Sequence, residues 1–361
     1  MAPASHVDID PDGDVLAILL RPVEPFAPWP SDAEDESSAP VANDEASNNG
    51  ESQESTAHDK RTLRLSSKHL MLACPRLKAM FTGQWEEVTK IHSDGLQHWD
   101  LGDNLDPDAF VIVMNIIHGR NRSVPQKVDL EMLAKICVII DDLECHEATE
   151  LFSRVWLMAF GGKTPSTYCR DLILRIFVAS VLREPDIFLI TTRTAMLSSA
   201  QEIRSLGLPI RLDIVERMEG GRKRMLRDTI RSLHGVADTL CGVKPRCSYE
   251  CDAILYGMLI KQMRDIGLPR PGEAIPDQGF AMESLVRSIC QFKDPTWFSQ
   301  MDVAHQFQAE PEPPKSSPFG SFGSFGSAPL VSQPASPSPS IFVPPASSPL
   351  ASKPPLKAPT E

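Results

Sequence analysis

The sequence has no apolar run of the roughly 18–20 residues that a membrane-spanning helix requires. Its first residues, MAPASHVDIDPDGD, are acidic and hold no apolar core of a secretory signal peptide. Eight cysteines are spread over 361 residues without a secretion signal, which favours reduced thiols. We therefore expect a cytoplasmic or nuclear protein that has no membrane partner.

A strong basic excess is also missing. The net charge is −12, and residues 31–59 hold nine acidic residues but no Lys or Arg. Residues 60–308 are nearly neutral, with 32 basic and 31 acidic residues. A general nucleic-acid binder carries clustered basic charge. The charge pattern predicts no specific nucleic-acid partner.

Familiar catalytic and cofactor motifs do not occur. The sequence contains no G-x-x-x-x-G-K-[ST], no G-x-G-x-x-G and no G-x-S-x-G motif. The acidic residues of the body are scattered, so they argue for no paired-carboxylate site. We expect a chain that is not itself an enzyme and that binds no cofactor.

What is present is a mixed pattern of strands and helices in the first half. A chain of this length exceeds the usual single core, which predicts two domains or one domain with tails. After the turn residues Asp10-Pro11-Asp12-Gly13, apolar periodicity predicts strands at 15–20, 62–65 and 98–101. It predicts helices at 68–73, 75–82, 106–118, 129–143 and 148–159. Residues 1–11 are expected to be disordered.

Two further segments are predicted to lack regular structure. Residues 22–59 combine five prolines with an acidic, Ser- and Asn-rich stretch that cannot bury enough apolar surface to fold. Residues 309–361 contain 14 prolines and 12 serines, which is typical of an extended tail. Between them, after Gly161-Gly162, only helical periodicity remains, and residues 163–308 are predicted to form an all-α domain.

Residues 69–83, HLMLACPRLKAMFTG, resemble the BTB/POZ pattern of a His, a leucine-rich turn and then Ser-x-x-Phe-x-x-Met-Phe. Residues 101–110 resemble the second BTB signature, where a strand leads to a helix that begins near Pro and carries a buried Phe. Residues 133–142 match the next helix. Cys74 replaces the usual Ser, Leu77 the usual Phe, and Leu143 stands where an aromatic residue is common.

The resemblance covers about residues 12–158 and implies an α+β fold in which a small sheet is flanked by helices. The helical remainder, including residues 247–252, is similar to the C-terminal region of fungal BTB-containing proteins. The family implies a protein–protein interaction scaffold. Its surfaces would pair with a second copy, with a cullin-type ubiquitin-ligase scaffold for which the chain is a substrate adaptor, or with another regulatory protein. The residues implied to carry pairing are Val15, Ile18, Leu20, His69, Leu70, Leu72, Leu77, Met80 and Phe81.

Two other groups invite chemistry. His69 lacks a second ligand or nucleophile at a motif spacing, so we expect its ring to hydrogen-bond backbone groups at a strand–helix junction. One candidate zinc site consists of Cys241, Cys247 and Cys251, with His234 upstream. Their spacings differ from the tight pairs of zinc sites, which favours packing of these cysteines in the core.

One basic cluster and the tail suggest a third function, that of a nuclear or transcription-linked factor. Arg222-Lys223-Arg224 with Arg227 and Arg231 would serve nuclear import or phosphate contact. Interspersed acidic residues instead favour the outer face of an amphipathic helix. The tail contains three Phe-Gly dipeptides between 319 and 326 and four Ser-Pro steps, which are candidates for weak docking and for phosphorylation.

Overall fold

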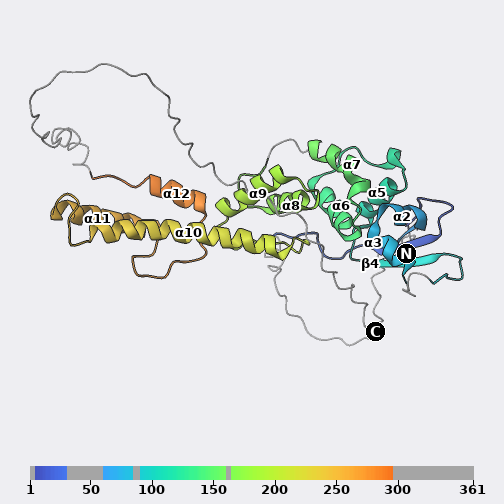
Figure 1. Cartoon of the computed structure of the whole chain (residues 1–361), viewed down its shortest axis with the longest axis horizontal. Coiled ribbons are helices and arrows are strands. Elements are labelled where there is room, and N and C mark those ends of the chain that lie inside the picture. The colour runs from blue at the N-terminus through green and yellow to red at the C-terminus, as the bar shows by residue number, and fades with distance from the viewer. Residues whose placement is uncertain (1–4, 31–59, 84–89, 160–163, 296–361) are drawn as a thin grey trace, which may run out of the picture. The chain divides into compact units, whose positions relative to one another are not determined.

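The computed structural model describes residues 5–30, 60–83, 90–159 and 164–295 (Figure 1). In these residues the chain is α+β, with a four-stranded sheet and ten α-helices. Residues 31–59 of the predicted insertion 22–59 and the whole predicted tail from 309 to 361 lie outside the described residues. None of the described helices is long and apolar enough to cross a lipid bilayer.

The sheet has the strand order β1-β3-β2-β4. Strands β2 (Val15–Leu20) and β3 (Lys60–Leu65) pair antiparallel, and β4 (Gln97–Gly102) adds to β2 in parallel. The turn before β2 needs its glycine, because a Cβ at Gly13 would lie 2.3 Å from the Leu65 carbonyl oxygen. The three strands predicted from apolar patterning are thus present.

An additional strand, β1 (Ser5–Asp8), pairs parallel with β3. This differs from the prediction that residues 1–11 are disordered. The missed signal is short: Val7 packs against the core, and the polar residues on either side of it gave no alternating pattern. Pairing with an existing strand supplies the backbone hydrogen bonds that so short a segment cannot obtain alone.

Five helices pack on this sheet or on one another: α2 (Ser67–Ala73), α3 (Pro75–Thr82), α5 (Pro107–Ile117), α6 (Leu130–Leu143) and α7 (His146–Ala159). Their starts follow local chemistry. The Asp106 carboxylate accepts hydrogen bonds from the backbone N–H groups of Asp108 and Ala109, and Asp129 caps α6 through the N–H of Met132. All five helices were predicted from the sequence to within about two residues.

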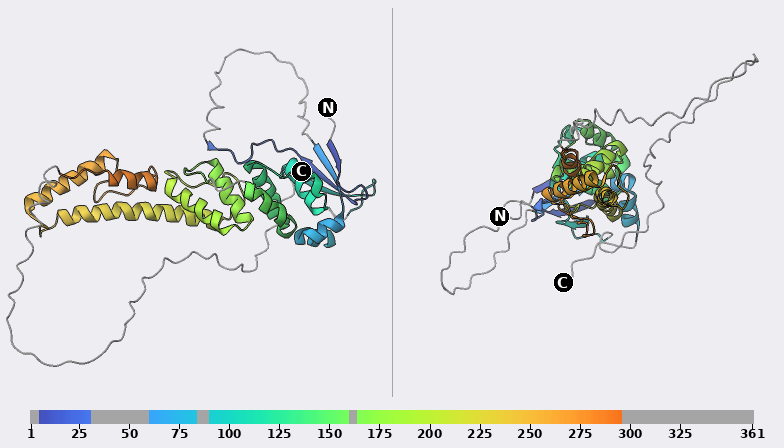
Figure 2. Two further views of the ribbon diagram at one scale, coloured as in Figure 1. Left: turned by 90° about the horizontal axis from the view of Figure 1, so that it is seen from above. Right: turned by 90° about the vertical axis from the view of Figure 1, so that its left-hand side faces the viewer.

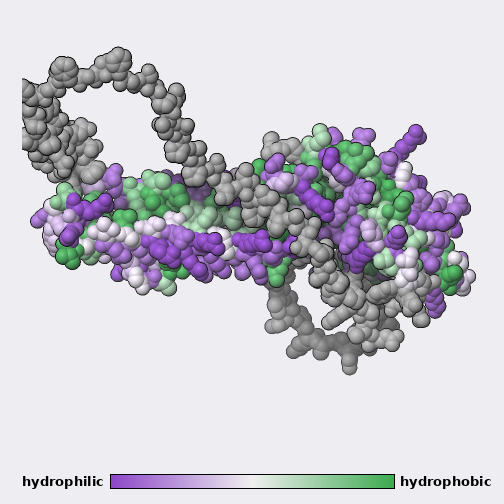
Figure 3. Space-filling view, viewed as in Figure 1, coloured by the Kyte–Doolittle hydropathy of each residue, from purple (hydrophilic) through white to green (hydrophobic). Residues whose placement is uncertain are grey.

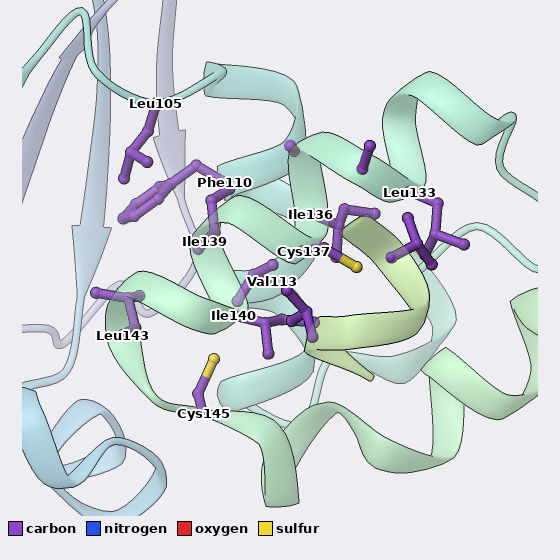
Figure 4. Packing of buried hydrophobic residues seen from close by; sticks show 14 of the residues in the cluster. Leu105, Phe110, Val113, Leu133, Ile136, Cys137, Ile139, Ile140, Leu143 and Cys145 are labelled. Atoms are coloured by element: carbon purple, nitrogen blue, oxygen red, sulfur yellow. The ribbon is translucent and has the colours of Figure 1, made fainter. Parts of the chain in front are cut away.

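The core of this region lies between α5, α6 and the sheet. Figure 4 shows Phe110 and Val113 of α5 near Ile139 and Ile140 of α6, with the Phe110 ring directed toward the strands. All four side chains are fully buried, and the Phe110 ring meets Trp99 of β4 edge to face at 5.7 Å. The buried Phe expected near the start of the 106–118 helix is therefore present.

Residues 22–30 also differ from the prediction of disorder where the structure describes them. Ala27 is buried, and Phe26 and Trp29 pack against the core. The Arg170 guanidinium donates hydrogen bonds to the carbonyl oxygens of Phe26 and Ala27. The prolines in this stretch prevent regular structure but do not prevent ordered packing.

Helices α8 (Arg170–Val181) and α9 (Pro185–Ser198) extend the same core, since α8 is almost wholly buried against α6. The sequence predicted α8 but missed α9, whose apolar residues are interrupted by threonines. We call the residues of this first cluster, from Ile9 to Met218, the N-terminal body. All described residues belong to one compact unit, Met1–Met301, and the proposed domain boundary near residue 160 remains a prediction.

The remaining helices form a second, smaller cluster. Helix α10 (Leu212–Leu240) begins in the N-terminal body and runs antiparallel to α11 (Tyr249–Asp265), as Figure 2 shows, with α12 (Met282–Cys290) packed on α10 and α9. No strand follows residue 102 in the part of the chain that the structure describes. We call residues 223–295 the C-terminal helices. The buried apolar residues of their cluster are Leu226, Ile230, Met263, Leu268 and Leu285, and Ala237 is buried as well.

Candidate interaction surface

Helix α7 presents an exposed apolar stripe. Its inner face buries Thr149, Ser153 and Trp156, and the Trp156 indole N–H donates to the Pro125 carbonyl oxygen at 2.8 Å. On the outer face, Leu151, Val155 and Met158 are 69%, 43% and 82% exposed. Their spacing of i, i+4 and i+7 places them on one line along the helix. Figure 3 shows hydrophobic surface over α7.

The apolar residues that mark the 148–159 helix in the sequence include Leu151, Val155 and Trp156. Only Trp156 is fully buried, while Leu151 and Val155 face outward. The apolar residues of α7 span more of the helix surface than the N-terminal body covers, so one strip of them is left without a partner in the described chain.

A groove lies beside the stripe, between α7 and the turn that joins α8 to α9. Its volume is about 360 Å³, within the usual range for binding sites. Leu157 and Leu182 form its apolar lining. Ser153 also lines it, and its hydroxyl oxygen is buried with no hydrogen-bond partner among the described residues.

Charged side chains line the remainder of the groove. Glu150 and Arg154 pair with each other on α7, whereas Glu147, Arg183 and Glu184 form no ion pair among the described residues. The groove thus has one more carboxylate than it has basic side chains. Arg183 has a φ of 57°, which is rare for a residue with a side chain and marks local backbone strain.

His146 stands at the N-terminal end of the groove. Burial and the neighbouring Arg183 charge lower the pKa of this imidazole below its usual value. The neutral ring therefore prevails near neutral pH, and it adds no positive charge to the groove.

The residues that the resemblance assigned to pairing are divided between core and surface. Val15, Leu70 and Leu77 are fully buried and hold the sheet and the α2–α3 pair together, so a partner cannot reach them in the folded chain. Ile18, Leu20, Met80 and Phe81 are partly buried, and the last two pack against the core. His69 and Leu72 are exposed, with Leu72 at 86%. Of the predicted set, Leu72 offers the largest free apolar side chain.

The backbone contacts expected of His69 belong to His118 instead. Its Nδ1–H donates to the Met114 carbonyl oxygen, and its Nε2 accepts the Ser66 backbone N–H at 3.0 Å, at the junction of β3 and α2. His69 is exposed and lies with its ring 5.1 Å from that of His118. The prediction identified the right junction but the wrong histidine.

The cysteines proposed as core residues are not in the core. Cys241 and Cys247 are exposed, Cys251 is half-buried, and the His234 Nε2–H donates to the Pro269 carbonyl oxygen. No cluster of three or more His, Cys, Asp or Glu side chains suited to a metal ion occurs among the described residues. The burial expected from the apolar stripe of α11 is realised only near its end, at Met263.

The basic cluster is also different from its predicted arrangement. Arg222 is 1% exposed instead of facing outward, and its guanidinium donates to both oxygens of Glu219 and to the Asp277 carbonyl oxygen. Lys223 also pairs with Glu219, and Arg227 pairs with Asp277. These three charges pair within the folded chain, as does Arg231 with Asp228 on the same helix, while Arg224 is exposed.

Comparison with known proteins gave no match: no family model, no curated protein and no solved structure is similar to this chain.

Proposed function

We propose that this chain is a protein-interaction module, without a catalytic step of its own, whose residues 12–158 form a BTB/POZ-like domain. The order of elements supports this proposal: two strands, two helices, a third strand and then three helices, arranged as a small sheet flanked by helices. The motif residues 69–83 span the α2–α3 pair, and residues 101–110 span the passage from β4 to α5.

The observation that carries the function is the outer face of α7. Three large apolar side chains stand in line on a well-packed helix, and large exposed apolar patches on otherwise well-folded proteins mark interaction sites. A helix that lies along such a stripe uses the helix-in-groove mode of recognition, with anchors at i, i+3 or i+4 and i+7.

We assign this surface to an amphipathic helix of a partner protein that carries Lys or Arg beside its apolar face. The groove next to the stripe contains Glu147 and Glu184, which have no basic partner among the described residues. A Lys or Arg side chain of the bound helix would form an ion pair with one of these glutamates. Charge complementarity of this kind chiefly sets specificity and association rate, while the apolar stripe supplies most of the affinity.

The test uses the full chain as bait and compares two charge-introducing pairs. Leu151→Glu with Met158→Glu places charge in the α7 stripe, and Leu189→Glu with Ile190→Glu does so on α9, at residues that are 55% and 53% exposed. We expect the α7 pair to lose the helical partner while the α9 pair retains it. Both pairs should keep the wild-type circular dichroism spectrum, because neither changes the core.

The identity of the captured protein decides between alternatives. Equal loss of a partner by both pairs, or retention by the α7 pair, would refute the assignment to α7. If light scattering shows a dimer that dissociates only with the α7 pair of substitutions, a second copy of the chain occupies this surface. That result would contradict the basic-helix assignment. Binding of a purified cullin N-terminal domain, lost in the α7 pair, would extend the proposal to a ubiquitin-ligase adaptor.

A further inference from the structure

The segment after β2, residues 23–30, lies against α6 and α8, and we call it the strap. Within it, only Phe26, Ala27 and Trp29 are withdrawn from solvent. Phe26 and Trp29 stand three residues apart and pack against the N-terminal body, while Ala27 between them is buried. The strap is therefore held in the way that short peptide ligands are bound, by two aromatic anchors and the backbone between them.

Two side chains receive the aromatic anchors. The Lys135 ammonium of α6 lies 5.6 Å from the centre of the Phe26 ring, which is within the range of a cation–π interaction. The Trp29 ring packs against Tyr168, just before α8, with ring centres 5.5 Å apart. Both contacts use the ring faces or edges of aromatic residues, so they select aromatic side chains at these two positions.

Arg170, at the start of α8, binds the backbone between the anchors. Its guanidinium donates to the carbonyl oxygen of Phe26 at 2.7 Å and to that of Ala27 at 2.9 Å. Every peptide offers backbone carbonyl groups, whatever its side chains are. Arg170 can therefore bind a different segment that presents two successive carbonyl groups at this point. We call Arg170, Lys135 and Tyr168 the strap site.

The strap site is held in place by groups outside the strap. Glu131 of α6 pairs with Arg170 at 2.8 Å and with Lys135 at 3.0 Å. The Tyr168 hydroxyl oxygen accepts the Arg204 backbone N–H at 2.9 Å. Each of the three side chains thus keeps a partner when the strap leaves, so the site stays formed for another ligand.

The backbone of the strap is strained at Ala27. Its φ of 47° lies in the left-handed region, which costs free energy for a residue with a side chain but not for glycine. Strained backbone of this kind persists only where surrounding contacts impose it, and the strain favours release of the segment. A ligand with glycine at this position would make the same backbone contacts without the strain.

Prolines surround the contact residues of the strap. Pro25, Pro28 and Pro30 are exposed, so their own contacts add little. Their rings fix φ and reduce the number of conformations open to the free segment, which lowers the entropy cost of binding. Proline near the aromatic anchors is therefore part of the pattern expected in a ligand.

We propose that the strap is a displaceable intramolecular ligand, and that the strap site binds a segment of a partner protein. In that segment two aromatic residues stand three apart, glycine follows the first of them, and prolines lie nearby. Strap and partner compete for one site, so binding of the partner releases residues 23–30 from α6 and α8. No residue of the strap site belongs to the α7 surface, so this inference does not rest on the proposed function.

The test measures binding of labelled synthetic peptides to the full chain by fluorescence anisotropy. The first peptide has the strap sequence, VEPFAPWP, and the second, VEPFGPWP, has glycine at the position of Ala27. In the receptor, Phe26→Ala with Trp29→Ala removes both anchors of the strap but no residue of the strap site. We expect this double variant to bind the first peptide at least about tenfold more tightly than the wild-type chain does, because a closed strap reduces the apparent affinity. The second peptide should bind several-fold more tightly than the first.

Further variants separate the strap site from the rest of the chain. Arg170→Ala, added to the double variant, removes the donor to the peptide carbonyl groups and should lower the affinity at least about tenfold. The control Arg287→Ala removes an exposed arginine of α12 and should leave the affinity unchanged. Ala27→Gly in the otherwise wild-type chain relieves the strain in the strap itself, so we expect weaker binding of both peptides. This variant keeps both anchors, so it tests the proposal even if the double variant fails to fold.

Equal affinity of the wild-type chain and the double variant, or binding that Arg170→Ala leaves unchanged, would overturn the proposal. Stronger binding by the Ala27→Gly chain would also contradict it. The sequence itself carries Pro-Phe-Gly-Ser-Phe at 318–322. If Phe319→Ala, Phe322→Ala and Phe325→Ala together raise the affinity of the otherwise wild-type chain for the peptides, the occupant is this segment, which would contradict the assignment to a partner protein.

Discussion

The N-terminal body and the C-terminal helices use similar sequence patterns but reach very different degrees of burial. In the body, α6 buries seven of its side chains between α5, α7 and α8. In the C-terminal helices, α11 buries only Asp252 and Met263, and its Ile254 is 46% exposed. Both helices carry apolar residues at helical spacing. The difference is that α6 has neighbours on several sides, whereas α11 contacts chiefly α10.

This contrast shows that periodicity predicts a helix and its apolar face but not how much of that face is covered. Free energy of folding follows the area that is buried, at about 25 cal/mol per Å² of apolar surface. The body therefore has far more stabilisation to lose than the C-terminal helices. Regions with few buried contacts open at lower free energy than the core of a protein does. We expect the C-terminal helices to open before the body unfolds.

The largest effect is expected in the body. Phe110→Ala removes a fully buried ring that packs against Trp99, and such truncations cost about 3–5 kcal/mol in the free energy of unfolding. Urea denaturation followed by tryptophan fluorescence measures this loss. Leu72→Ala, at a side chain that is 86% exposed, should change the free energy of unfolding by less than about 0.5 kcal/mol. A small effect of Phe110→Ala would contradict the assignment of the core.

The next effect tests the junction between the two regions. Glu219 pairs with buried Arg222 and also accepts the Ile203 backbone N–H at 3.2 Å, while Arg222 bonds to the Asp277 carbonyl oxygen. Glu219→Ala leaves a buried guanidinium without its counter-ion, which costs about 3 kcal/mol. Thermal or urea denaturation measures this loss.

The matched control is Glu283→Ala, which removes the exposed partner of Arg287 on α12. Exposed pairs of this kind contribute at most about 0.5 kcal/mol. The two substitutions delete the same side chain from two ion pairs that differ in burial. Equal effects would show that burial of Arg222 does not set the strength of the junction.

The sequence predicted most elements because strands and helices of this chain follow local signals. The turn at Gly13, the caps Asp106 and Asp129 and the apolar spacing of α5 and α6 all lie within a few residues of the elements they define. Strand β1 escaped prediction because it is stabilised by β3, more than fifty residues away. The ordered packing of residues 22–30 likewise depends on Arg170, which no local pattern connects to them.

The candidate surface was less predictable than the fold. Sequence spacing placed Leu151, Val155 and Trp156 on one apolar face, but which of them faces the core depends on where α5 and the Pro125 carbonyl lie. The available signal was that the apolar residues of α7 spread over a wider sector of the helix surface than one packed face covers. The sequence could not tell whether His69 or His118 accepts the Ser66 backbone N–H, because this depends on where the C-terminal end of α5 lies. Contacts between residues far apart in the sequence decide both which α7 residues are buried and which histidine bonds to Ser66.

The third prediction asks whether the C-terminal helices open separately. Leu285→Ala removes a buried side chain of the second cluster, at an expected cost of about 2 kcal/mol, near the low end for buried leucines because this cluster is small. Native-state hydrogen exchange should accelerate in α11 and α12, while exchange in β3 and α6 stays unchanged. The neighbouring exposed Val286→Ala should affect neither region. Equal acceleration in β3 and α6 would mean that both regions unfold as one unit.

The smallest effect is a pH dependence confined to the body. Burial is the main cause that lowers the pKa of His118 below its usual 6.5; the hydrogen bond to Met114 opposes it, and nearby His69 and Arg120 lower the pKa while Asp10 raises it. The unfolded chain therefore binds a proton on His118 at a higher pH than the folded chain does. The stabilisation from the neutral ring is fully present above about pH 6.5 and is lost as pH falls through the lower folded pKa. Protonation also removes the Nε2 lone pair that accepts the Ser66 N–H.

We expect His118→Gln, which keeps an acceptor but does not titrate, to reduce the fall in the urea midpoint between about pH 7.5 and pH 5.5. His146→Gln should reduce it separately, because the pKa of His146 is lowered in the same direction. Exchange in α11 should not follow either substitution, and a pH dependence in α11 that disappears with His118→Gln would show that the two regions are energetically coupled.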